Sequence, residues 1–132
     1  MPVALSLRIL VVRALFEDAD LKDYVQKTIS ELWGAHHELT IARNDIELLW
    51  AMRSGNFDLI IVFVNLASPP ETQRCRQVAV WFRAMRPSPK VVVVSKFFNG
   101  IGAVRDEVGA NKLLLCLPSP SDINGAIAHL FP

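Results

Sequence analysis

Three carboxylates, Glu17, Asp18 and Asp20, lie a few residues beyond the first apolar run of the chain. Clustered carboxylate oxygens are the ligands that Mg²⁺ prefers, and carboxylates also act as general acids and bases. Acidic residues are equally common in the first turn of a helix, where the helix dipole favours negative charge. We favour a solvated helix start, with a displaced acidic cluster as the alternative.

Adjacent histidines, His36 and His37, would suggest a metal site if further ligands lay nearby. Neighbouring side chains on a strand point to opposite faces, and the sequence offers no third ligand close to this pair. We therefore expect a loop and edge-strand pair and no metal site. His129, near the end of the chain, suits a helix C-terminus, where a cation is favoured.

A group of arginines marks the segment between the third and fourth apolar runs: Arg74, Arg76, Arg83 and Arg86. Acidic neighbours are scarce there, so Arg76 and Arg83, with Lys90, could form a basic stripe for phosphates. A solvated helix face is the commoner explanation, and we favour it.

Aromatic residues in the same segment raise the question of an interface. Trp81 and Phe82 are adjacent, so one of them must turn away from the core. Trp33 and Trp50 pose the same question. An exposed aromatic side chain would indicate a surface that binds protein.

Known catalytic motifs are missing from the sequence. Gly100-Ile101-Gly102 lacks the third glycine of a dinucleotide-binding fingerprint and follows the fourth apolar run instead of the first. There is no P-loop, no GxSxG elbow and no Ser/His/Asp arrangement readable from spacing. We predict no catalytic residue, no cofactor and no metal.

Composition indicates one soluble domain covering residues 1–132. Of the residues, 52% are hydrophobic and 20% charged, and the net charge is +1, so electrostatics gives no reason to expect nucleic acid or an acidic membrane as partner. Cys75 and Cys116 are too few for a disulfide framework. Without a signal peptide or an apolar run of about 20 residues, we expect a reduced, cytoplasmic protein.

Five short apolar runs predict strands, three of them nearly uninterrupted Val, Ile or Leu, which is typical of strands buried on both faces. They are Ile9–Val12, Leu39–Ala42, Leu59–Val64, Val91–Val94 and Leu113–Leu117. The second alternates like an edge strand, with His37, Leu39 and Ile41 on one face and Glu38 and Thr40 on the other.

Segments with helical spacing separate and follow the apolar runs. The first covers Leu21–Leu32, with Asp18 or Asp20 as a cap and Gly34 at its end; the second follows Asn44 as N-cap; the third starts near Pro69; a poor fourth surrounds Ile101 and Val108; the fifth follows Ser121-Asp122. Five alternations of strand and helix predict an α/β fold: a five-stranded parallel sheet with helices on both faces.

The spacing of these strands resembles the response-regulator receiver domain, the CheY-like family, over about Leu7 to Leu130. The landmark segments are Arg8–Val12, Phe57–Val62, Val91–Ser95 and Leu115–Pro118, with Asp122 at the start of the last helix. The resemblance implies a flavodoxin-like (βα)5 fold and a role in two-component signal transduction.

Five positions carry the phosphorylation site in that family, and here they read Arg13, Ala14, Phe63, Ser95 and Leu117. The resemblance implies an acidic pair after the first strand, a phosphoacceptor aspartate at the end of the third and a lysine before the proline after the fifth. Arg13-Ala14, Phe63 and Leu117 replace them, and only the hydroxyl residue, Ser95, remains.

These replacements remove the chemistry, because phosphoryl transfer to a carboxylate needs a nucleophile in line and a divalent cation held by oxygen ligands. We interpret the chain as a non-phosphorylatable pseudo-receiver that works by binding a protein partner or a second copy. Nucleic acid would be reached only through an output domain that this chain does not include. The resemblance implies a partner surface after the fourth strand, with Lys96, Phe97, Phe98 and Ile101.

The alternative is a flavodoxin-like small-molecule binder or enzyme that uses the crevice at the strand ends. Arg13, Asn65 and Ser95 would line that crevice.

Overall fold

The computed structural model describes residues 6–13, 22–54, 56–64, 69–85, 88–95, 112–114 and 119–131. The predicted fourth helix, around Ile101 and Val108, lies outside these residues. The last predicted strand is described over Lys112–Leu114, so its expected continuation to Leu117 is also outside them.

One parallel sheet runs through the molecule, in the strand order β2-β1-β3-β4-β5. The strands are β1 (Arg8–Val12), β2 (Glu38–Ala42), β3 (Leu59–Val64), β4 (Lys90–Ser95) and β5 (Lys112–Leu114). All four pairings are parallel. The predicted five-stranded parallel sheet is confirmed. Strand β2 lies on one side of β1, and β3, β4 and β5 follow on the other, so the strand order reverses at β1.

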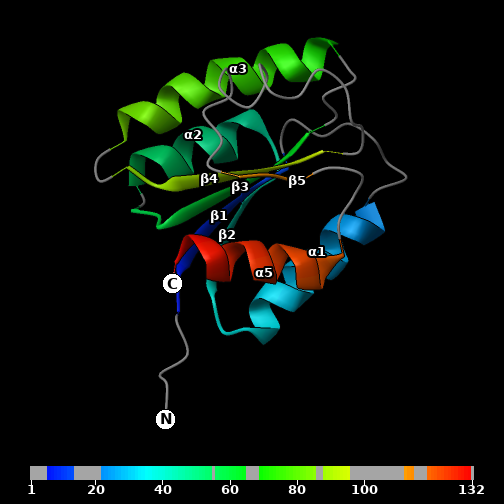
Figure 1. The fold of residues 1–132 in the computed structure, drawn as a ribbon. Helices are drawn as coiled ribbons and strands as arrows, with labels where there is room; N and C mark the ends of the chain where they lie inside the picture. The colour runs from blue at the N-terminus through cyan, green and yellow to red at the C-terminus, as the bar shows by residue number, and fades with distance from the viewer. Residues whose placement is uncertain are drawn as a thin grey trace.

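Helices cover both faces of this sheet (Figure 1). They are α1 (Lys22–Gly34), α2 (Asp45–Ser54), α3 (Pro69–Ala84) and α5 (Pro120–Leu130). Helices α2 and α3 lie side by side over one face, and α1 and α5 lie over the other. This arrangement confirms the α/β class. None of the described helices is long and apolar enough to cross a membrane.

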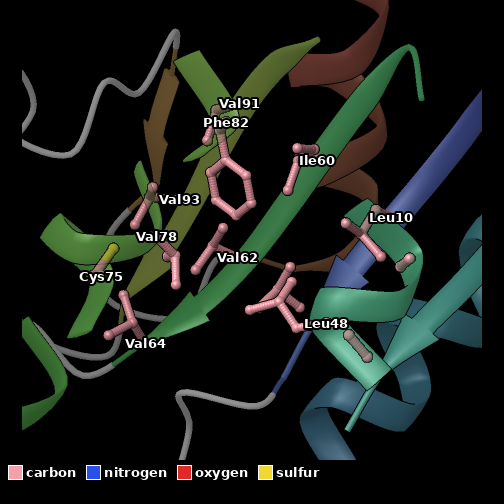
Figure 2. Packing of buried hydrophobic residues seen from close by; sticks show 13 residues of the cluster. Leu10, Leu48, Ile60, Val62, Val64, Cys75, Val78, Phe82, Val91 and Val93 are labelled. Carbon is pink, nitrogen blue, oxygen red and sulfur yellow. The ribbon is translucent and has the colours of Figure 1, made fainter. Parts of the chain in front are cut away.

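Alternating side chains of the central strands divide the core into two layers. Ile60, Val62 and Val64 of β3 point toward α2 and α3. Figure 2 shows Ile60 and Val62 near the ring of Phe82, and Val64 near Cys75. Leu59, Ile61 and Phe63 point toward α1 and α5. All six side chains are buried, and each aliphatic one contributes about 1.5–3 kcal/mol by leaving water. Both faces of β3 are therefore committed to packing.

Two helix starts show how local sequence fixes the elements. Asn44 caps α2 as predicted, because its side-chain oxygen accepts the N–H of Glu47 at 2.9 Å. The predicted start of the last helix after Ser121-Asp122 is wrong by three residues, because α5 begins at Pro120. Ser119 is the N-cap of α5 and forms a capping box with Asp122, and Pro120 suits the first helical position.

The edge strand β2 alternates as its sequence predicts. Leu39 and Ile41 are half-buried, and Glu38 and Thr40 are exposed. His36 lies in the preceding turn with a positive φ of 66°, and His37 is buried just before the strand. Its Nδ1 accepts the backbone N–H of Leu7 at 3.1 Å. The histidine pair is thus a loop and strand-entry pair, and His37 links the starts of two strands.

Candidate functional site

The carboxyl ends of β1 and β3 lie side by side, where parallel α/β sheets place their ligand crevice. Val12 pairs with Val62, so Arg13 and Phe63 are the next residues of two neighbouring strands. On the other side of β3, Val64 pairs with Ser95 of β4. Three of the five predicted positions, Arg13, Phe63 and Ser95, therefore lie at the carboxyl ends of three adjacent strands, β1, β3 and β4.

Phe63 occupies the penultimate position of β3 and is only 1% exposed. Its ring meets the ring of Tyr24 of α1 edge-on, with centroids 6.2 Å apart and planes at 84°. This geometry is the one that aromatic pairs favour. An apolar ring of the α1/α5 layer fills this place, and it has no atom that can attack phosphorus or bind a cation.

Tyr24 supplies the other half of this contact from the first turn of α1. Burial raises the pKa of its phenol to about 12; the negative charge of Asp122 adds to this increase, and a hydrogen bond with Thr28 opposes it. The phenol is therefore neutral at physiological pH. It supplies no negative charge that could replace a carboxylate beside Phe63.

Arg13 follows β1 and is half-buried. Its backbone N–H donates to the carbonyl of Ala42 at 3.0 Å, which continues the β1–β2 ladder by one bond. The ladder thus anchors the backbone that carries the guanidinium. A fixed positive charge at this strand end opposes binding of a divalent cation there.

Ser95 ends β4 and is fully buried. A hydroxyl can donate to a phosphate oxygen, yet Ser95 has no solvent exposure in this structure. Val64, which pairs with it on β3, and Phe63 are also buried. The described side chains at the ends of β3 and β4 are therefore part of the packed interior.

Other predicted site residues lie outside the described residues. These are Ala14 and Leu117 of the degenerate site, the predicted partner surface of Lys96, Phe97, Phe98 and Ile101, the loop residue Asn65, and the acidic residues Glu17, Asp18 and Asp20. Their roles stay predictions.

Two polar residues near this edge were not singled out from the sequence. Glu71 and Thr72, in the first turn of α3, are both buried. Pro69-Pro70 signals the start of that helix, but the sequence holds no signal that the carboxylate after it is covered. Within the described residues, no three His, Cys, Asp or Glu side chains gather closely enough to hold a metal ion.

The structure shows which of the aromatic side chains turn away from the core. Trp81 is 43% exposed while its neighbour Phe82 is 3% exposed, so the first turns outward as expected for one of the pair. Trp33 and Trp50 are exposed as well. Two of these three side chains, Trp50 and Trp81, lie on the helices that cover the same face of the sheet.

Comparisons with known proteins give matches among solved structures. No protein-family model and no curated protein matches the chain. A CheY-like response regulator receiver domain protein from Methanospirillum hungatei JF-1 superposes with a TM-score of 0.69, at 20% identity over 95% of this chain and 93% of that one. A response regulator from Thermotoga maritima gives 0.67, at 18% identity over 95% and 97%.

This chain has the receiver fold. A third structure with this fold, the Thermotoga maritima response regulator TrrA in complex with Mg²⁺ and BeF, gives a TM-score of 0.66, at 19% identity over 93% of this chain and 97% of that one. TrrA has also been solved in complex with the histidine kinase ThkA. At these identities the similarity establishes the fold, and the receiver-like topology 2-1-3-4-5 agrees with it.

Proposed function

We propose that the chain is a pseudo-receiver: a single receiver-like domain that does not accept a phosphoryl group and regulates by binding another protein. It has no enzymatic activity of its own and acts in the cytoplasm, as part of a two-component or related signalling system. The partner is a protein or a second copy of the chain. The surface after β4, with Lys96, Phe97, Phe98 and Ile101, is one place where we expect contact.

The observation that carries this proposal is the position of Phe63. Counting along β3, this residue stands where the receiver fold keeps its phosphoacceptor, and its ring is buried against Tyr24. A carboxylate is the minimum requirement for aspartyl phosphorylation. A buried aromatic ring removes both the nucleophile and the space that it needs.

The charge at the end of β1 supports the same proposal. The receiver fold needs acidic ligands there to hold Mg²⁺, and Arg13 brings the opposite charge. Leu117, in place of the lysine, would leave the phosphate without its counter-charge. One replacement could be compensated by a neighbour, whereas these three replacements remove the nucleophile, the metal ligands and the counter-charge and leave only the hydroxyl of Ser95.

Protein binding is the function that remains for such a domain. One solved response regulator with this fold, TrrA, is in complex with the histidine kinase ThkA, so that domain binds a protein partner. A receiver-like domain that cannot be phosphorylated can still cover a partner's surface or hold one fixed conformation.

The test is incubation of the purified chain with Mg²⁺ and a small phosphodonor, followed by intact-mass measurement. We expect no phosphoryl adduct, under conditions that label a phosphorylatable receiver run in parallel. A stable adduct that maps to Asp18, Asp20 or any other carboxylate of the chain would refute the proposal.

A further inference from the structure

An apolar band crosses the outer surface of α2 and α3, away from the sheet. Its members are the large hydrophobic side chains that these two helices leave exposed: Ile46, Leu49, Trp50, Val80 and Trp81. Trp50 and Trp81 alone, at 69% and 43% exposure, present roughly 250 Å² to solvent, given about 150–250 Å² for a whole aromatic side chain. That is near a third of the ~800 Å² that one partner contributes to a standard protein interface.

Inside the band, a groove of about 230 Å³ lies between the two helices. Leu48 and Leu49 of α2 line it from one side, and Val78 and Trp81 of α3 from the other. Its volume is below the ~300–1,000 Å³ that small-molecule sites usually have. A groove of this size fits one large apolar side chain inserted by a partner, in the manner of a helix that docks by a few anchors.

Arginines surround the band. Arg74 lines the groove and forms an ion pair with Asp45 across it. Arg53 comes four residues after Leu49 on α2, is exposed, and so lies one turn further along the same side of that helix. Arg43 lines a shallow hollow together with Trp50, and Arg76 and Arg83 are the i−4 and i+3 neighbours of Val80 on α3.

In the described residues from Arg43 to the end of α2 and in α3, the acids are fewer than the five arginines: they are Asp45, Glu47 and Glu71. Asp45 is held by Arg74, and a carboxylate oxygen of Glu47 accepts the backbone N–H of Arg43 at 3.3 Å. Glu71, the acid of α3, is buried. The rim of the band therefore carries excess positive charge, and the complementary occupant is acidic.

We propose that the groove between α2 and α3 binds an amphipathic helix of a partner protein, which inserts one large apolar side chain between Leu49 and Trp81 and places a carboxylate against Arg53. The inference rests on the proposed function, since it names the partner chemistry of a protein-binding domain. Its residues are none of those that make up the surface expected after β4.

Two other occupants fit the surface less well. Ile46, Leu49 and Val80 are aliphatic, and nucleic-acid bases stack on aromatic rings. A second copy of the chain would place the same excess of arginines opposite itself, and like charges across an interface are unfavourable. A helix with an apolar stripe and acidic flanks satisfies both the groove and its rim.

The experiment uses the full chain, labelled with ¹⁵N, and a synthetic helical peptide as probe. The peptide carries leucine at positions i, i+4 and i+7 and glutamate on both flanks, and a matched peptide has lysine in place of every glutamate. We expect saturable shifts of amide signals along α2 and α3 with the glutamate peptide, and binding weaker by at least about tenfold with the lysine peptide.

Matched variants distinguish binding in the groove from nonspecific binding elsewhere on the surface. Trp81→Ala and Arg53→Glu should each weaken binding by about tenfold, as truncated interface anchors commonly do. Trp33→Ala and Lys27→Glu, which change an exposed tryptophan and an exposed basic residue of α1, should leave binding within about twofold. All four positions are exposed, and unchanged spectra away from the mutation will verify the fold of each variant.

Several results would overturn the inference. These are equal binding of the two peptides, shifts confined to α1 and α5, or full binding by the Trp81→Ala variant. Shifts on α2 and α3 that grow with protein concentration alone would assign the face to a second copy. Displacement of the peptide by a single-stranded oligonucleotide would assign it to nucleic acid. A phosphoryl adduct would instead refute the proposed function and leave this measurement standing.

Discussion

Replacing Phe63 tests whether its ring fills the carboxyl end of β3, because the loss of a buried ring lowers the free energy of unfolding. Phe63 is 1% exposed in the layer formed with α1 and α5, and its ring contacts Tyr24. Truncating a buried phenylalanine costs about 3–5 kcal/mol, because apolar area is lost and a cavity remains. Phe63→Ala should lower the free energy of unfolding by this amount, a large part of the ~5–15 kcal/mol that a domain of this size has.

Urea unfolding, followed by circular dichroism, measures this change. Phe63→Leu should cost about 1–1.5 kcal/mol, so it gives a milder point on the same scale if the alanine variant is too unstable. Trp33→Ala is the matched control, an aromatic truncation at a position 58% exposed. It should cost under about 1 kcal/mol.

A double-mutant cycle resolves the ring contact itself. Combining Phe63→Leu with Tyr24→Leu should give a coupling energy of about 0.5–1.5 kcal/mol, the range for edge-on aromatic pairs. The reasoning is refuted if Phe63→Ala costs no more than Trp33→Ala. In that case the residue does not fill the strand end, and the crevice is open to a ligand.

Three further predictions follow from single contacts. Burial lowers the pKa of His37 from 6.5, so its contribution to stability is complete above pH 6.5 and declines as pH falls toward the folded-state pKa, by at most about 1.4 kcal/mol per pH unit. Urea unfolding from pH 7.5 to pH 5 checks this, and the free energy of unfolding of a His37→Leu variant should not change with pH over this range. An equal pH dependence of the free energy of unfolding in both proteins would contradict the prediction. Burial raises the pKa of the Cys75 thiol to about 12, so in a Cys116→Ala background a disulfide reagent at pH 8 should react only in denaturant, and fast labelling of the folded chain would show the opposite. Ser119→Ala should cost about 1 kcal/mol through loss of the N-cap of α5, while Ser121→Ala, in the same turn, should change thermal unfolding far less; equal losses would move the cap.

The fold was predictable because its signals are periodic. Val and Ile runs gave the limits of β3 without error and those of β4 within one residue at each end. Asn44 gave the start of α2 for a local reason, its own hydrogen bond. The start of α5 was missed since Ser119 and Ser121 are both acceptable N-caps in isolation, and the capping box with Asp122 decides between them.

The candidate site was predictable in part. Strand spacing placed Arg13, Phe63 and Ser95 at one edge, because the register of parallel strands carries that information. Burial of Glu71 and exposure of Trp50 were not readable, since both depend on how helices pack against the sheet and not on local pattern. The groove between α2 and α3 could not be found from the sequence for the same reason: it exists only when the two helices are adjacent.

The most direct test of the lost phosphorylation chemistry is an NMR titration of the full chain with Mg²⁺ and beryllofluoride, which mimics a bound phosphoryl group. We expect the amide signals of Arg13, Phe63 and Ser95 to stay unchanged up to millimolar Mg²⁺ with beryllofluoride present. Saturable shifts of these signals, at the edge where β1, β3 and β4 end, would contradict this expectation.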